Sequence, residues 1–223
     1  MSSKVTSFEY TLSSFEFFFF LFPFLRACIL FVMEPQTITI LFVGDERCGK
    51  STLLSRISRG RHNLKGIDSI TLLRDLDQPF IFDIRTRRGD YRFEFYDTSS
   101  PGSWRLLRPD LVILCYDISQ RLSLINLQRV WNKEVRTAGV TGDSTPVLML
   151  GLKRDLRSEN DPNGTIYPQE AYRMAQEMRL DKYMECSAAT GELLEEVFDD
   201  ICTTALKTTT SEGGQSEGGC TIM

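Results

Sequence analysis

The chain has 223 residues, which is enough for one α/β domain with terminal tails. Hydrophobic residues make up 42% of the sequence and charged residues 25%, so one packed core is expected. The net charge of −4 argues against a nucleic-acid-binding surface, which needs a basic stripe, and we expect no nucleic-acid partner. Six cysteines without paired spacing and a single histidine argue against structural zinc and predict reduced thiols in the cytoplasm.

The first 32 residues differ in composition from the rest and are predicted to be an apolar N-terminal extension, residues 1–32. The apolar stretch 15–33 is interrupted by Glu16, Pro23 and Arg26. A transmembrane helix needs about 20 uninterrupted apolar residues, and a signal peptide needs a basic start and a cleavage site. A third alternative is that Met33 is the true start and the extension is not native. The three alternatives remain open, and the third is favoured.

Residues 44–51, Gly-Asp-Glu-Arg-Cys-Gly-Lys-Ser, match the phosphate-binding pattern G-x-x-x-x-G-K-[ST]. The glycines let successive backbone N–H groups point at phosphate oxygens. Lys50 is expected to reach the β- and γ-phosphates, and the Ser51 hydroxyl to bind Mg²⁺. The loop residues predicted to contact nucleotide are Asp45, Glu46, Arg47, Cys48, Gly49, Lys50, Ser51 and Thr52.

The flanking sequence predicts the elements that such a loop requires. Residues 37–43 are apolar and β-branched, which is typical of a buried parallel strand, and residues 51–59 place Leu53, Leu54 and Ile57 on one helical face. A helix that begins at the loop adds partial positive charge to the site.

The rest of the chain alternates strands with helices. The pattern predicts strands at 80–86 and 91–96 joined as a hairpin, then 111–116, 146–150 and 183–186, with helices at 123–137, 168–178 and 191–207. We therefore predict an α/β fold with a mostly parallel six-stranded sheet, one antiparallel edge strand, and helices on both faces.

Asp97 ends the second hairpin strand, where a carboxylate is placed to hold Mg²⁺. The order of phosphate loop and then Asp97-Thr98 resembles the Ras-like small GTPases. Residues 151–156 resemble the guanine motif of that family, and residues 183–188, Tyr-Met-Glu-Cys-Ser-Ala, resemble its last base-contacting loop. The Rho branch is indicated by this last segment, together with 107–109 and 155–157. Cys48 and residues 97–99 resemble its GTPase-deficient Rnd members.

The resemblance covers residues 37 to about 206 and implies roles for further residues. Asp155 would accept hydrogen bonds from guanine, Lys153 would lie along the base, and the Ser187–Ala188 backbone would donate to the base oxygen. A domain over residues 33–207 would then bind GTP or GDP with Mg²⁺. The remaining positions are His62, which would stack on the base, Ser100, whose N–H would contact the γ-phosphate, and Thr71, with Ser69 as the alternative, which would bind Mg²⁺.

Departures from the family pattern argue against efficient hydrolysis. Glu46 replaces a glycine of the phosphate loop, and Pro101 falls where a glutamine should orient the attacking water. Ser100 also replaces a glycine, Leu152 replaces the asparagine that ties the base loop to the phosphate loop, and Ala189 replaces a lysine.

The C-terminus predicts a lipid anchor. Residues 208–223 form a Ser/Thr/Gly-rich tail that ends in Cys220-Thr-Ile-Met, a C-a-a-X box whose final Met favours farnesyl. A single prenyl chain anchors reversibly, so we expect a monomeric cytoplasmic protein that associates reversibly with membranes.

The leading hypothesis is a Rho/Rnd-like switch that binds guanine nucleotide, protein effectors and regulators but hydrolyses GTP slowly or not at all. One alternative is a pseudo-GTPase that keeps the fold as an interaction module. Another is a slow GTPase whose missing catalytic group is supplied by a partner. No catalytic residue is assigned.

Overall fold

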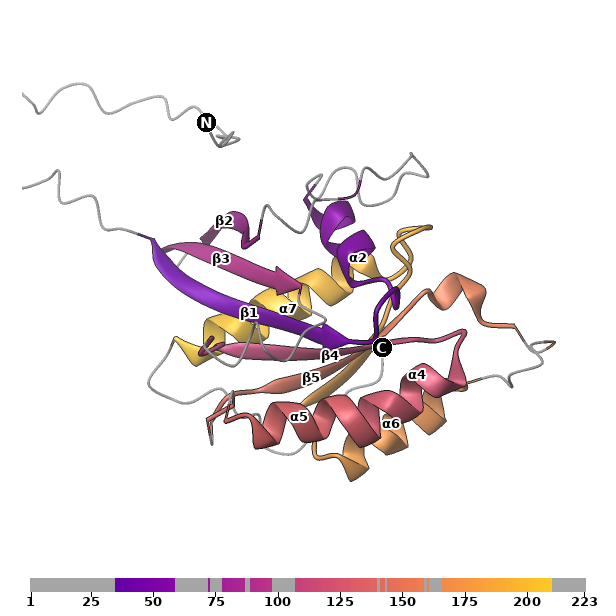
Figure 1. Cartoon of the computed structure of the whole chain (residues 1–223). Coiled ribbons are helices and arrows are strands. Elements are labelled where there is room, and N and C mark those ends of the chain that lie inside the picture. The colour runs from indigo at the N-terminus through magenta and orange to yellow at the C-terminus, as the bar shows by residue number, and fades with distance from the viewer. Residues whose placement is uncertain are drawn as a thin grey trace, which may run out of the picture. The chain divides into compact units, whose positions relative to one another are not determined.

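The computed structural model describes residues 35–58, 72, 78–86, 89–97, 107–139, 141–142, 144–158, 160 and 166–209 of the chain. Six strands form one sheet in the order β2-β3-β1-β4-β5-β6 (Figure 1). The strands are β1 (Gln36–Gly44), β2 (Phe80–Thr86), β3 (Gly89–Asp97), β4 (Leu111–Asp117), β5 (Val147–Leu152) and β6 (Lys182–Glu185).

Among the described strands, the hairpin is the only antiparallel pair. β2 pairs antiparallel with β3, whereas β3, β1, β4, β5 and β6 run parallel to one another. The predicted mostly parallel sheet with one antiparallel edge strand is therefore confirmed. All five parallel strands end at the same edge, so the residues that follow β1, β3, β4, β5 and β6 gather there.

Side chains of the central strands alternate between two cores, as the period of two in a strand requires. In β1, Ile38, Ile40 and Phe42 enter one cluster, and Leu41 and Val43 enter the other. A strand covered on both faces must be apolar at consecutive positions, which explains the unbroken hydrophobic stretch in the sequence.

Helices cover both faces of the sheet (Figure 1). α2 (Lys50–Ile57) and α7 (Leu194–Thr208) contribute side chains to the first cluster. The second cluster is covered by α6 (Pro168–Glu177) and by the continuous helical segment α4 (Arg121–Asn126), η3 (Leu127–Trp131) and α5 (Asn132–Thr137). Among the described residues, no helix is long and apolar enough to cross a membrane.

The helical segment 121–137 corrects one detail of the sequence-based prediction. The sequence predicts a helix over 123–137 with Leu124, Leu127, Val130 and Trp131 directed inward. Instead Val130 is 44% exposed, and Val135 is buried. At 3.6 residues per turn, six residues carry Val130 about 120° around the helix from Leu124, and Val130 also lies within the π-helical turn η3.

Candidate nucleotide-binding site

The loop between β1 and α2 is shaped by two glycines. A Cβ added to Gly44 would lie 2.2 Å from the carbonyl oxygen of Cys115, so β1 and β4 can approach this closely only without a side chain here. Gly49 has φ +116° and precedes α2 as its N-cap residue. The loop also holds Arg47 at φ 61°, a left-handed conformation that is rare outside glycine.

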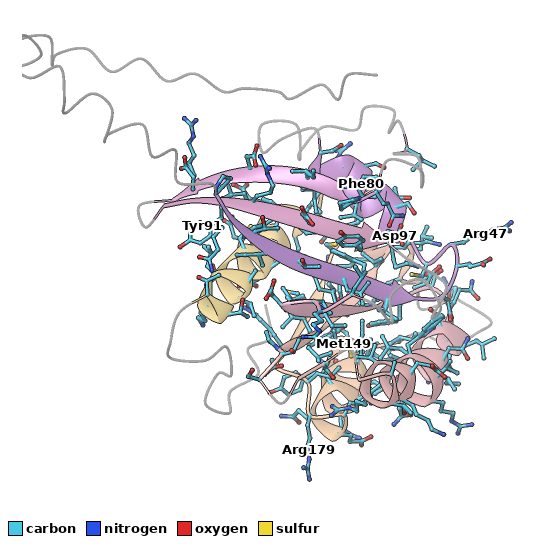
Figure 2. The ribbon with its side chains drawn as sticks, turned by 60° about the vertical axis from the view of Figure 1, so that its left-hand side comes forward. Arg47, Phe80, Tyr91, Asp97, Met149 and Arg179 are labelled. Atoms are coloured by element: carbon cyan, nitrogen blue, oxygen red, sulfur yellow. The ribbon has the colours of Figure 1, made fainter. Side chains whose placement is uncertain are left out.

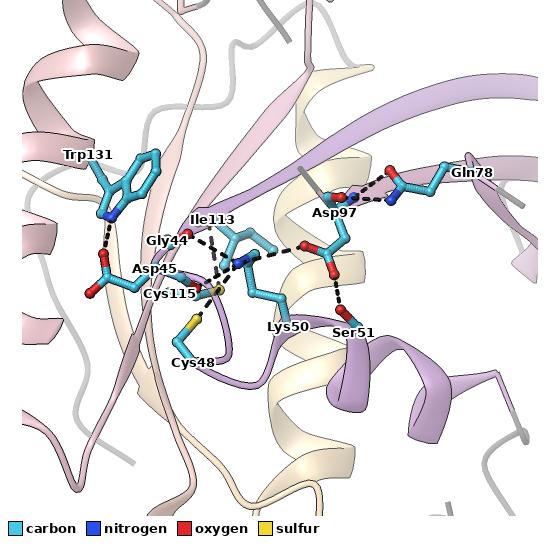
Figure 3. A network of polar contacts seen from close by, with 10 residues as sticks. All are labelled: Gly44, Asp45, Cys48, Lys50, Ser51, Gln78, Asp97, Ile113, Cys115 and Trp131. Carbon is cyan, nitrogen blue, oxygen red and sulfur yellow. Dashed lines mark hydrogen bonds and ion pairs between the residues drawn. The ribbon is translucent and has the colours of Figure 1, made fainter. Parts of the chain in front are cut away.

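Lys50 points back into this loop. Its ammonium nitrogen donates to the carbonyl oxygens of Gly44 at 3.1 Å and Asp45 at 2.9 Å (Figure 3). It also lies 3.7 Å from Oδ1 of Asp97, and Lys50 is only 4% exposed. A buried ammonium needs compensating partners, and this one has two carbonyls and a carboxylate.

Asp97 is held from two sides. The Ser51 hydroxyl donates to Oδ2 of Asp97. The Gln78 side chain donates to the Asp97 carbonyl oxygen at 2.7 Å and accepts from its N–H at 3.1 Å. The tip of β3 is thereby fixed next to the first turn of α2, as Figure 3 shows. Gln78 was not found from the sequence, because a glutamine before a strand carries no motif.

The residues of this loop fit a phosphate anion. The N-terminus of α2 has no side-chain cap, so no capping side-chain oxygen accepts from the backbone N–H groups of its first turn. The positive end of the helix dipole and the Lys50 ammonium meet at the same place. Burial raises the pKa of the Cys48 thiol, an effect that neighbouring Lys50 opposes, and the neutral thiol adds no negative charge.

The same loop also fits a hard divalent cation, provided that phosphate is present. Ser51 and Asp97 offer two oxygens side by side. In the described part of the chain, no group of three or more His, Cys, Asp or Glu side chains could hold a metal ion. Mg²⁺ characteristically binds through one or two carboxylates with phosphate and water oxygens, which is the donor set available here.

A second loop, after β5, reaches the phosphate loop through Lys153. Its ammonium nitrogen donates to the Arg47 carbonyl oxygen at 2.8 Å and lies 2.7 Å from Oδ2 of Asp117. The Arg47 side chain itself extends away from the molecule (Figure 2). Leu152 packs against the loop where the family pattern has asparagine, and its Cβ would lie 3.6 Å from a Cβ added to Gly49.

The loop after β6 meets the loop after β5. Ser187 Oγ donates to Oδ1 of Asp155, and the Arg154 N–H donates to the Cys186 carbonyl oxygen at 3.2 Å. Asp155 is exposed, whereas Ser187 and Ala188 are buried. The sequence-predicted residues Lys153, Asp155, Ser187 and Ala188 therefore lie together at the carboxyl edge of the sheet.

The buried carboxylate of Glu185 supports the loops after β5 and β6. Glu185 is 6% exposed, accepts hydrogen bonds from Tyr183 and Arg157, and lies 3.5 Å from the guanidinium of Arg154. Arg154 and Arg157 flank Asp155 in the sequence. The ion pairs therefore fix the short helix η4 (Arg154–Leu156) that carries the exposed Asp155.

Asp45 has a second role that the sequence did not indicate. Its carboxylate accepts from the Asn126 amide at 3.0 Å. It also accepts from the Trp131 indole N–H at 2.7 Å, as Figure 3 shows. These donors stand five positions apart at the two ends of the π-helical turn, which brings both to the same carboxylate. The phosphate loop is thus attached to the helical segment on the other face of the sheet.

Some predicted positions lie outside the described residues: His62, Ser69, Thr71, Ser100, Pro101 and Cys220. Glu46 is described and is exposed at the rim of the phosphate loop.

A six-stranded α/β sheet with a glycine loop after its first strand defines the class of small GTPase folds. Comparison with known proteins agrees with this class. The family model described as Ras family matches residues 39–207.

The relatives are Rho-type proteins. The chain is 27% identical over 206 residues to the GTP-binding protein rho2 of Schizosaccharomyces pombe, which covers 85% of this chain and 98% of the relative. It is 30% identical to the GTP-binding protein RHO4 of Eremothecium gossypii, over 76% of this chain and 64% of the relative. It is 29% identical to the Ras-like GTP-binding protein RhoL of Drosophila melanogaster, over 75% of this chain and 86% of the relative. The chain therefore belongs to the Ras family, and these relatives support its place in the Rho branch.

The Asp45–Trp131 contact can be measured by a double-mutant cycle. Trp131→Phe removes the N–H donor, and Asp45→Ala removes the acceptor. We expect a coupling energy of about 1.5 kcal/mol in urea unfolding, the lower end for hydrogen bonds to charged groups, because the pair is partly buried. A control cycle replaces Trp131→Phe with Tyr91→Phe. Tyr91 pairs with the start of β1, at the end of that strand opposite the phosphate loop, and this cycle should give coupling within about 0.5 kcal/mol of zero. Equal coupling in the two cycles would contradict the contact.

Proposed function

We propose that this protein is a guanine-nucleotide-binding signalling switch of Rho/Rnd type. It binds GTP and GDP with Mg²⁺, contacts effectors and regulators through its switch surface, and hydrolyses GTP weakly or not at all. Membership of the Ras family supports the switch, and the residues of the site support the finer assignment.

The observation that carries the proposal is the meeting of three loops at one edge of the sheet. Lys50 lies in the phosphate loop, Lys153 contacts that loop at the Arg47 carbonyl, and Asp155 contacts Ser187. A phosphate-binding loop and an exposed carboxylate are thereby held at a fixed separation. A guanine base offers N–H donors to such a carboxylate at a position where adenine has none.

Weak hydrolysis is inferred from the residue types at two positions. Hydrolysis requires a group that orients the attacking water against the γ-phosphate. Pro101 has neither a side-chain amide nor a backbone N–H for this purpose. Glu46 adds an exposed carboxylate at the rim of the phosphate loop, where negative charge opposes the negative phosphate.

One observation favours the second candidate, a pseudo-GTPase. Leu152 is 1% exposed and packs on Gly49, where the family pattern has an asparagine that ties the two loops by hydrogen bonds. An apolar contact does not reproduce that tie. The protein would then use the same fold as an interaction module with little bound nucleotide.

Membrane association is proposed from the sequence of the tail. Cys220 is followed by Thr-Ile-Met, which would take a farnesyl group, and the tail carries no basic cluster as a second signal. We therefore propose a cytoplasmic protein that binds the cytosolic face of membranes reversibly.

Changing Lys50 to Ala tests the nucleotide site. The wild-type chain should be stabilised by about 2.7 kcal/mol at a GTP concentration one hundred times its dissociation constant, seen as a rise in melting temperature. Lys50→Ala should abolish this rise, because the phosphates lose their main counter-charge. Lys182→Ala, on β6 and paired with Asp200, is the matched control and should keep it. An unchanged rise in Lys50→Ala would refute the assigned site.

Changing Cys220 to Ser tests the lipid anchor. The variant should move from the membrane fraction to the soluble fraction in cells, because the prenyl acceptor thiol is gone. Cys202→Ser, on α7, serves as control and should keep the wild-type distribution. If Cys220→Ser stays with membranes, the farnesyl proposal is wrong and the apolar stretch 15–33 becomes the better candidate anchor.

A further inference from the structure

Asp117 is a buried carboxylate at the carboxyl end of β4. The residue is 5% exposed and belongs to no motif of the sequence. Its Oδ1 accepts from both the N–H and the hydroxyl of Ser119, at 2.9 and 2.7 Å. Its own N–H donates to the Ser123 hydroxyl oxygen at 3.1 Å. The side chain is therefore fixed by the turn that follows the strand.

The other carboxylate oxygen faces the base loop. Oδ2 lies 2.7 Å from the ammonium of Lys153; the Asp117 side chain is 8% exposed and the Lys153 side chain 34%. Asp117 stands beside Leu152 in the ladder between β4 and β5, and the Ile118 N–H donates to the Leu152 carbonyl at 2.9 Å. The end of β4 thus holds the first residues of the base loop by both backbone and side chain.

The backbone conformation of Lys153 is one that persists only when other contacts hold the residue in place. Its backbone has φ 59°, a left-handed conformation that is unfavourable for a residue with a side chain. Conformations of this kind persist where surrounding contacts determine them. The ammonium is held between Asp117 and the Arg47 carbonyl, so the far end of the Lys153 side chain is constrained.

We propose that Asp117 is a positioning residue that ties the guanine-base loop to the phosphate loop through Lys153. In this chain the tie replaces the hydrogen bonds that an asparagine would make from position 152, where Leu152 makes only an apolar contact. The anionic charge of Asp117 keeps the ammonium aimed at the Arg47 carbonyl. Loss of that charge frees both loops and shortens the lifetime of bound nucleotide. This inference rests on the proposed nucleotide-binding function.

Asp117→Asn tests the inference. Asparagine keeps the shape and the acceptor for Ser119 but removes the charge that faces Lys153. We expect release of a fluorescent GDP analogue to be at least about tenfold faster, as expected for loss of a hydrogen bond to a charged group. Asp110→Asn is the matched control: it makes the same change at the other end of β4, where Asp110 accepts from the Thr39 N–H at 2.8 Å. Its release rate should stay within about twofold of wild type.

A second readout separates positioning from a general loss of stability and does not need nucleotide. Amide hydrogen exchange, measured without nucleotide, should rise in residues 45–49 and 153–157 of Asp117→Asn and remain at wild-type values in β1 and α7. Unchanged exchange in both loops, or a uniform rise across the sheet, would overturn the inference even if nucleotide release were faster. A release rate within twofold of wild type would also overturn it.

Failure of the proposed function has a different signature. If the wild-type chain does not bind the labelled GDP, the nucleotide-binding proposal fails, and the exchange measurement alone decides whether Asp117 ties the loops. If Asp117→Asn does not fold, Asp117→Glu replaces it with the same two readouts. That variant keeps the charge but displaces it by one methylene, so we expect changes in the same direction and of smaller size.

Discussion

The buried ammonium of Lys50 is the constraint on which the site depends. It lies among two loop carbonyls and the Asp97 carboxylate at 4% exposure, so β1, α2 and β3 must meet within a few ångströms. The parallel sheet makes this possible, because β1 and β3 are neighbours and end at the same edge. Burying a charge without partners costs free energy, and the Lys50 ammonium has two carbonyl oxygens of the turn as partners besides Asp97. The same charge, together with the uncapped start of α2, makes this turn suited to an anion.

The phosphate loop is connected in two further directions. Lys153 links it to the loops after β5 and β6, and Asp45 links it to Asn126 and Trp131 on the opposite face of the sheet. A displacement of this loop therefore changes its contacts both with the loop after β5 and with the helical segment 121–137. In a signalling switch, these contacts offer a route from bound phosphate to the outer surface. Two residues that depart from the family pattern, Glu46 and Leu152, lie in or against this loop, and the fold is kept.

The fold was predictable from the sequence because its signals are local and strong. Apolar β-branched stretches, helical periodicity and the Pro168 helix start identified every strand of the sheet and the helices around it. The predicted inward direction of Val130 was wrong, because six residues at helical spacing place it well around the helix from Leu124. The partners of the site residues were not predictable either. Gln78, Asn126 and Asp117 contact site residues 19, 81 and 36 positions away in the chain, and no spacing rule connects them.

The nucleotide that copurifies with the chain tests the central claim most directly. The protein, expressed from Met33 and purified in Mg²⁺, is denatured, and the released nucleotide is identified by chromatography. A guanine nucleotide switch with failed hydrolysis predicts mostly GTP at about one molecule per chain. Mostly GDP would contradict the assignment of lost hydrolysis to Glu46 and Pro101. No nucleotide at all would contradict nucleotide binding and favour the pseudo-GTPase.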